Sequence, residues 1–102
     1  MKKIINGRKY DTDTAKVCGF MSKGYDTRDY SCYEETLYQK KNGEFFLYGE
    51  GGPSSKYASA LDAHNYIGSC RIIPLSEFDA KRWAEEWLTV EDYEEIFGEV
   101  EE

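Results

Sequence analysis

The chain has 102 residues, of which 40% are hydrophobic and 16% aromatic, with 20 acidic and 13 basic side chains. This length is enough for one domain with a modest core, and the aromatic content is too high for a disordered acidic tail. We therefore expect a single folded domain spanning residues 1–102. No run approaches the roughly 18 apolar residues of a membrane span, and no signal-peptide core follows Met1, so we expect a cytoplasmic protein.

The net charge of −7 is unevenly distributed along the chain. Residues 1–75 carry 11 basic and 9 acidic side chains, a balance of +2, whereas residues 76–102 carry 2 basic and 11 acidic side chains, a balance of −9. An acidic chain is not drawn to nucleic acid or to an anionic membrane by its overall charge. The composition thus favours a basic protein surface as partner, with no direct nucleic-acid contact and no membrane contact.

The first elements in chain order are a hairpin and a short helix. Asn6-Gly7 between two β-prone runs predicts a β-hairpin that ends near Tyr10. Asp11 or Asp13 can cap a helix over about residues 12–18, which Gly19 would end. Residues 20–29 show no clear period, which indicates a polar loop.

The central hairpin, within residues 30–53, contains the strongest local signal. Asn42-Gly43 as a two-residue turn places Tyr38 opposite Leu47 and Leu37 opposite Tyr48. Phe46 and Tyr48 then share a face with Leu37. A type I turn with Gly43 in a bulge would shift this register by one residue, so both pairings remain open.

The remainder of the chain ends in helices. The glycine-rich residues 49–55 predict a turn, residues 56–69 show no clear pattern, and residues 71–73 predict a short strand closed by Pro74. Ser76 caps a helix with an apolar stripe of Ala80, Trp83, Ala84, Trp87 and Leu88. Thr89 caps a second helix, which Gly98 ends.

These elements predict an α+β fold. A small antiparallel sheet is built on the central hairpin and covered on one face by the two C-terminal helices. A short helix follows the N-terminal hairpin.

Candidate metal ligands are few and widely spaced. Cys18, Cys32, His64 and Cys70 have the type and number needed for a structural zinc, but no pair has CxxC spacing. The alternative is that the cysteines are buried free thiols in a reducing compartment. No cofactor is therefore expected, with zinc as the one alternative.

Catalytic apparatus is not indicated. The glycine cluster 49–52 lacks the Lys-Ser/Thr ending of a phosphate-binding loop and precedes no helix. Adjacent carboxylates such as Glu34-Glu35 diverge in a strand, so they form no acid/base pair. We expect a protein that is not an enzyme.

Carboxylates in the predicted helices are the candidate partner-binding residues: Glu85, Glu86, Glu91, Asp92, Glu94 and Glu95. Several lie in the middle or last turn of a helix, where the helix dipole disfavours negative charge. They serve either solubility or the imitation of a phosphate backbone. A rival surface is the aromatic outer face of the central hairpin, around Phe46 and Tyr48.

Three blocks carry a family resemblance: INGRKYDTDTAK, EETLYQKKNGEFFLYGEGGPSSKY and IIPLSEFDAKRWAEEW. They resemble a family of small proteins of bacterial phages and integrative elements that looks related to anti-CRISPR inhibitors of the type II RNA-guided DNA nuclease. The resemblance covers most of the chain except residues 20–29 and 58–69. The blocks do not include the cysteines or His64.

The resemblance implies an inhibitor that works in the host bacterial cytosol. Such a protein would bind a type II CRISPR effector nuclease through its acidic surface and block the loading of target DNA. The alternative is a non-catalytic accessory or regulatory binding module of a phage or integrative element, with or without stabilisation by zinc.

Overall fold

The computed structural model describes residues 1–24 and 30–102, and the part of the predicted loop that covers 25–29 lies outside the described residues. The chain has the predicted α+β class, with two C-terminal helices. The elements are β1 (Lys2–Ile5), β2 (Arg8–Asp11), β3 (Lys16–Lys23), β4 (Tyr33–Gln39), β5 (Phe45–Gly51), β6 (Ser59–Ala60), β7 (Tyr66–Ile67), β8 (Ser69–Leu75), α1 (Glu77–Trp87) and α2 (Val90–Phe97).

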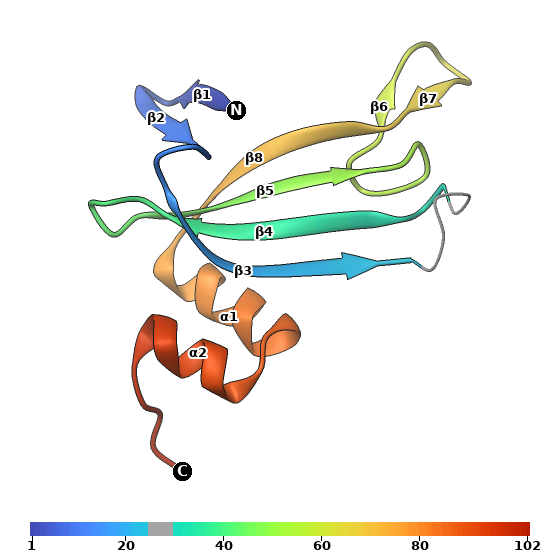
Figure 1. Ribbon diagram of the computed structural model, residues 1–102. Helices are drawn as coiled ribbons and strands as arrows, with labels where there is room; N and C mark the ends of the chain where they lie inside the picture. Colours follow the sequence, from blue (N-terminus) through green and yellow to red (C-terminus); the bar gives the residue numbers. More distant parts are fainter. Residues whose placement is uncertain (25–29) are drawn as a thin grey trace.

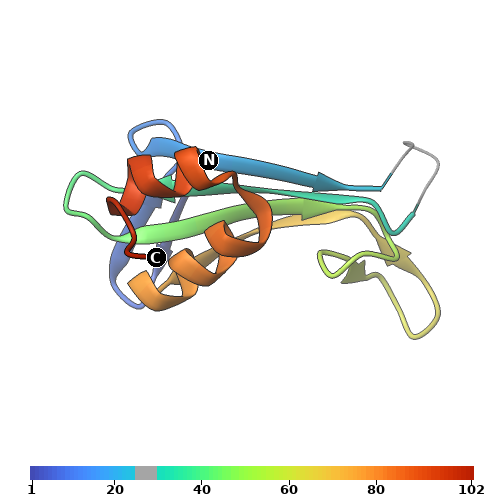
Figure 2. The same cartoon turned by 90° about the horizontal axis from the view of Figure 1, so that it is seen from below.

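A four-stranded antiparallel sheet in the order β3-β4-β5-β8 is the centre of the fold (Figure 1). Two separate hairpins, β1–β2 and β6–β7, extend from it. Figure 2 shows α1 and α2 lying across one face of this sheet. Pro74 lies in β8, an edge strand with a neighbouring strand on one side only. Proline, which lacks a backbone N–H, is tolerated in edge strands because they need fewer interstrand hydrogen bonds.

Both helices begin where the sequence predicts. The hydroxyl oxygens of Ser76 and Thr89 accept hydrogen bonds from the backbone N–H groups of Asp79 (3.1 Å) and Asp92 (3.2 Å). Gly98 caps α2 with a φ of 91°. Each cap supplies an acceptor to an N–H group that the helix leaves unpaired, so these local sequence signals determine the helix starts.

The larger core lies between the sheet and the helices. Leu37, Leu47 and Met21 point from the sheet toward Ala80 and Trp83 of α1, and all five are buried. From α2, the ring of Phe97 packs on Phe45 with ring centroids 5.4 Å apart. The apolar stripe of α1 therefore contacts the sheet, as its spacing predicts.

A smaller core lies on the opposite face of the sheet, beneath the β1–β2 hairpin. Phe46 is fully buried there, stacked on Tyr38 at 5.2 Å and in edge contact with Tyr10 at 5.4 Å between ring centroids. The hairpin forms at the predicted Asn6-Gly7 turn, with φ of 51° and 77° at these two residues.

The central hairpin has the register that is shifted by one residue, and the prediction of a two-residue turn at Asn42-Gly43 is wrong. Leu37 pairs with Leu47 and Tyr38 with Phe46, because the N–H of Lys40 bonds to the carbonyl of Glu44 (2.8 Å) around a loop of residues 41–43. Gly43 adopts a φ of 94°. The shift moves Phe46 and Tyr48 to the face opposite Leu37. Leu47 and Phe45 join the larger core, and Phe46 joins the smaller one.

The predicted helix over residues 12–18 is also wrong. Asp11 accepts a hydrogen bond from the N–H of Asp13 (2.9 Å), which forms a turn, and strand β3 starts at Lys16. Residues 20–23, predicted as loop, continue this strand. A two-turn helix is marginal in isolation, whereas β3 pairs with β4 from Lys16 to Lys23, with one register shift between Val17 and Gly19.

Residues 56–69 hold the β6–β7 hairpin and one buried anchor, Tyr57. Within the ranges that the structure describes, no helix has the length and apolar character needed to cross a membrane.

Candidate functional site

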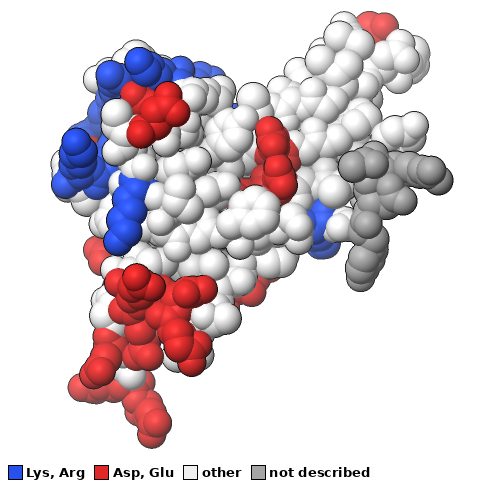
Figure 3. Space-filling model, in the orientation of Figure 1, with Lys and Arg blue, Asp and Glu red and all other residues white. Residues whose placement is uncertain are grey.

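The six candidate carboxylates lie together on α1 and α2, and we call them the acidic surface: Glu85, Glu86, Glu91, Asp92, Glu94 and Glu95. All are exposed except Glu94, which is half-buried and accepts a hydrogen bond from the N–H of Val100 (3.1 Å). Figure 3 shows the acidic side chains gathered where α2 and the C-terminal tail lie.

This part of the chain has no internal compensation of charge. Residues 83–102 hold nine Asp and Glu side chains and no Lys or Arg. Neither helix carries a basic residue in its last turn, and the ion pair on α1 joins Glu77 to Lys81 (3.6 Å), outside the acidic surface. Among the described residues, no member of the acidic surface forms an ion pair. The carboxylates are therefore available to an external cation.

A groove of about 570 Å³ lies between the two helices, within the acidic surface. Its apolar lining includes Leu88, Val90 and Tyr93, and the carboxylates of Glu85 and Glu94 also line it. Val90 is 69% exposed, so an apolar side chain reaches the surface among the carboxylates. An apolar centre with a charged rim is the usual arrangement of a protein–protein interface.

The helices hold these carboxylates in fixed positions. Trp83 anchors α1 in the larger core, and Phe97 of α2 lies between Phe45 and Tyr93, at 5.4 and 4.9 Å between ring centroids. Leu88, at the joint between the helices, lies against Gly19 of β3 at a point where a Cβ would approach its side chain to 2.7 Å. The absence of a side chain at Gly19 thus permits the close contact of this joint with the sheet.

The rival aromatic surface is only partly present. Phe46 is fully buried beneath β1–β2, so the expectation that it lies on the outer surface is wrong. Tyr48 is half-buried on the uncovered part of this face, and its hydroxyl donates to Glu50 (3.3 Å). A hydrogen bond with Cys70 is the main cause that raises the pKa of Tyr48 above its ordinary value.

Beside Tyr48, four residues form a row across the sheet: Ser22, Glu34, Glu50 and Cys70. They line an open hollow of about 690 Å³. The carboxyl groups of Glu34 and Glu50 lie opposite each other, and their mutual hydrogen bond raises the pKa of Glu34. One shared proton between the two carboxyl groups relieves the repulsion between like charges.

The four zinc candidates do not converge. Cys18 is in β3, Cys32 precedes β4, His64 lies in the β6–β7 turn, and Cys70 is in β8. Burial raises the pKa of the Cys18 thiol, which disfavours the thiolate that zinc requires. Over the residues that the structure describes, no three His, Cys, Asp or Glu side chains group as metal ligands.

A buried carboxylate, Glu35, was not anticipated from the sequence. It is 2% exposed and accepts hydrogen bonds from the Tyr57 hydroxyl, from the Trp83 indole (3.0 Å) and from the Lys56 ammonium (2.8 Å). Burial alone would raise the pKa of Glu35, but the three hydrogen bonds hold it below its ordinary value. Its partners come from segments far away in sequence, so no local pattern could have revealed it.

The role of Glu35 is to join three parts of the fold. Through it, β4 is tied to α1 and to the loop that carries Lys56 and Tyr57. Gly49 leaves room for the Tyr57 ring, which would overlap any Cβ at that position. Among the described residues no buried side-chain N or O atom lacks a partner, so this network is a structural anchor for α1, the helix that bears Glu85 and Glu86 of the acidic surface.

Comparisons with protein-family models, with curated proteins and with solved structures find no match to this chain.

The geometry alone thus ranks the candidate sites. The acidic surface is mostly exposed, forms no ion pairs among the described residues, and lies on helices that are packed against the sheet. In the proposed aromatic surface, by contrast, Phe46 is buried in the smaller core. The cysteines and His64 are dispersed over four segments. The arrangement on α1 and α2 suits the binding of a basic partner.

Proposed function

We propose that this chain is a non-catalytic inhibitor that docks its acidic surface on a basic, nucleic-acid-binding surface of a partner protein. In line with the sequence resemblance, the partner is a type II RNA-guided DNA nuclease of the bacterial host, and the step that fails is the loading of target DNA. The observation that carries the proposal is the run of nine carboxylates without a cation over residues 83–102, six of them on two packed helices and three in the C-terminal tail.

Complementary charge is the first basis for this docking. Nucleases of this class hold the guide–target duplex in a positively charged channel. A protein with exposed carboxylates along two helices competes for the same lysines and arginines that would contact DNA phosphates. Complementary charge raises the rate of association and fixes the orientation of docking.

Rigidity and the groove add affinity to this attraction. The helices are fixed by Trp83 and Phe97, so few degrees of freedom are lost when the acidic surface binds. The exposed Val90 and the groove beside Leu88 offer an apolar centre that a charged rim surrounds. An apolar residue of the partner, flanked by basic residues, would fill this groove.

The test is a pair of charge reversals with a matched control. Glu91→Lys with Glu95→Lys changes two exposed carboxylates of the acidic surface. Asp13→Lys with Glu77→Lys changes the net charge by the same amount at exposed positions outside it. The readout is the binding of labelled target DNA to guide-loaded nuclease as each protein is added.

We expect the wild-type chain and the control to suppress DNA binding alike, and the reversed pair to need at least about tenfold more protein. Equal inhibition by the reversed pair would overturn the role of the acidic surface. Failure of the wild-type chain to bind the nuclease would overturn the inhibitor and favour the accessory module.

A further inference from the structure

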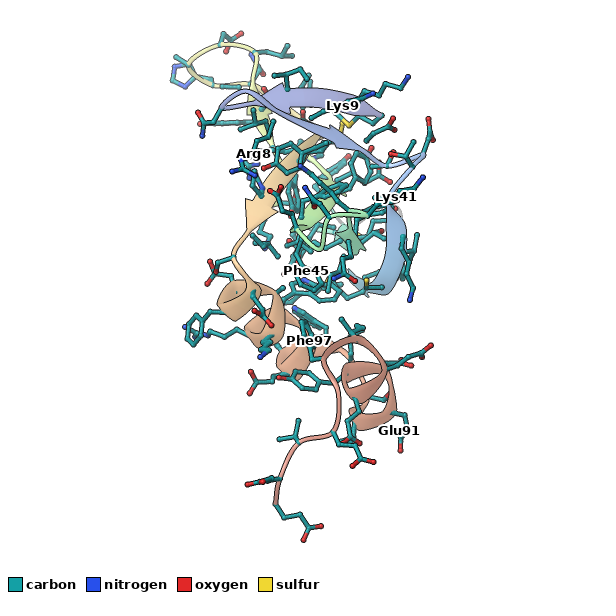
Figure 4. The ribbon with its side chains drawn as sticks, turned by 90° about the vertical axis from the view of Figure 1, so that its left-hand side faces the viewer. Arg8, Lys9, Lys41, Phe45, Glu91 and Phe97 are labelled. Carbon is teal, nitrogen blue, oxygen red and sulfur yellow. The ribbon has the colours of Figure 1, made fainter. Side chains whose placement is uncertain are left out.

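The opposite part of the molecule carries a second charged surface, formed by two hairpins that are distant in sequence. Arg8 and Lys9 belong to β2, and Lys40 and Lys41 to the β4–β5 connection; we call these four residues the basic cluster. Figure 4 shows Arg8, Lys9 and Lys41 on one side of Phe45 and Phe97, with Glu91 on the other. In Figure 3 the basic side chains gather around the β1–β2 hairpin, away from α2.

Three of the four residues of the basic cluster border a small hollow of about 270 Å³. Lys9, Lys40 and Lys41 line it, together with the polar residues Thr14 and Asn42. One carboxylate, Asp11, also lines it, but Asp11 is 5% exposed and its oxygen already accepts the N–H of Asp13. The Asn42 amide already donates to the Glu44 carboxylate (2.7 Å) and accepts the N–H of Glu44 (3.0 Å). Lysine ammonium groups and a threonine hydroxyl are groups with which proteins contact phosphates.

The positive charge of this cluster is only partly neutralised. Arg8 and Lys40 share one carboxylate, that of Glu44, at 2.7 and 3.8 Å. The ammonium of Lys40 also lies 3.7 Å from the centre of the Tyr10 ring. Lys9 and Lys41 are exposed, and within the described part of the chain neither forms an ion pair. Two cations are therefore free for an external anion.

We propose that the basic cluster binds the phosphate backbone of a nucleic acid. The cations are spread over two hairpins, which suits a polymer with repeated charges better than one small anion. The ring within the cluster, Tyr10, is 4% exposed and covered by Lys40, so it offers no surface on which a base could stack. Recognition is therefore of phosphates and is independent of base sequence.

The net charge of −7 does not prevent this contact, because the two charged surfaces are separate. The molecule measures 48 × 34 × 21 Å along its principal axes. At physiological salt, the screening length is about 8 Å, so repulsion from α2 is weak at the basic cluster. If the proposed function holds, the acidic surface would rest on the nuclease while the basic cluster meets nucleic acid that the nuclease carries.

The experiment uses the isolated chain, so it does not depend on the nuclease. A fluorescein-labelled single-stranded RNA of 20 nucleotides and mixed sequence is titrated with protein, and its anisotropy is measured between 50 and 200 mM salt. The variant Lys9→Gln with Lys41→Gln removes the two free cations. Lys23→Gln with Lys81→Gln removes the same charge away from the cluster.

We expect weak binding that the cluster variant reduces at least about fivefold, with the control unchanged. The slope of log affinity against log salt should fall by about 1.4, or about 0.7 for each lost phosphate contact. Absent binding at 50 mM salt, or equal binding by the cluster variant, would overturn the proposal.

Three further measurements distinguish a nucleic acid from other ligands of the basic cluster. Inorganic phosphate at the same phosphate concentration should compete poorly with RNA, and equal competition would show a site for a single anion instead. Polyglutamate that binds as tightly as RNA would show an acidic protein partner and overturn the proposal. Sedimentation of the chain alone should show a mass that does not rise with protein concentration. A rising mass would mean that the chain self-associates, with the basic cluster of one copy bound to the acidic helices of another, and would overturn the proposal.

Discussion

At the scale of single residues, Glu35 has a structural role that its neighbours in the sequence do not indicate. Glu34 and Glu35 are neighbours in β4, yet one faces an open hollow and the other is enclosed by Tyr57, Lys56 and Trp83. The alternation of a strand separates their environments completely. Identical side chains can thus make opposite contributions to stability.

The first prediction concerns Glu35→Ala. The change leaves two buried donors, on Tyr57 and Trp83, without their acceptor, at about 1–3 kcal/mol each. Denaturant unfolding should show this loss. Glu34→Ala is the matched control and should cost little, because it also removes the repulsion with Glu50. Equal losses in the two variants would contradict the role assigned to Glu35.

The second prediction concerns pH. The pKa of Glu34 is raised in the folded state by its hydrogen bond with Glu50, above the ordinary value of 4.5. A group with a raised pKa contributes stability below its unfolded pKa and loses it as pH rises through the folded pKa. Glu34→Gln should therefore stabilise the fold more at pH 7 than at pH 4, as measured by unfolding free energy. The same gain at both pH values would show that the two carboxyl groups do not share a proton.

At the scale of elements, the two C-terminal helices were predictable and the sheet only in part. Ser76 and Thr89 signal helix starts through contacts within three residues, so a local reading suffices. The Asn42-Gly43 signal also located a hairpin correctly. The choice between its two registers depends on whether Phe45 or Phe46 faces the helices, which is decided by tertiary packing.

Three further failures have the same cause. Strand β3 replaces the predicted helix because its partner, β4, lies beyond residue 32 and is invisible to a local pattern. The acidic surface was found from charge alone, whereas its apolar groove needed the relative positions of α1 and α2. The burial of Phe46 followed from the β1–β2 hairpin, which no periodicity of the central hairpin could indicate.

The third prediction tests how α1 docks. Trp83 is 8% exposed and hydrogen-bonded to Glu35, while Trp87, one turn later, is half-buried. Trp83→Ala should cost about 3–5 kcal/mol of unfolding free energy, and Trp87→Ala clearly less. A greater loss for Trp87→Ala would mean that α1 meets the sheet through another face.

At the scale of the whole molecule, the distribution of charge matters more than its sum. The overall value of −7 combines an acidic surface on α1 and α2 with a basic cluster on two hairpins. The net charge alone argues against nucleic acid as a partner, but in the folded chain the basic cluster forms a cationic surface separate from α1 and α2. Folding thus places two separate surfaces of opposite charge on one small chain.

We propose that the acidic surface occupies the place of DNA on the nuclease. The most direct measurement is the binding of the chain to immobilised, guide-loaded nuclease, before and after that nuclease is saturated with target DNA. If the two compete, binding should be strong on the empty complex, weaken with rising salt, and be lost on the DNA-filled complex. Equal binding to the empty and the DNA-filled complex would show that the acidic surface does not occupy the place of DNA.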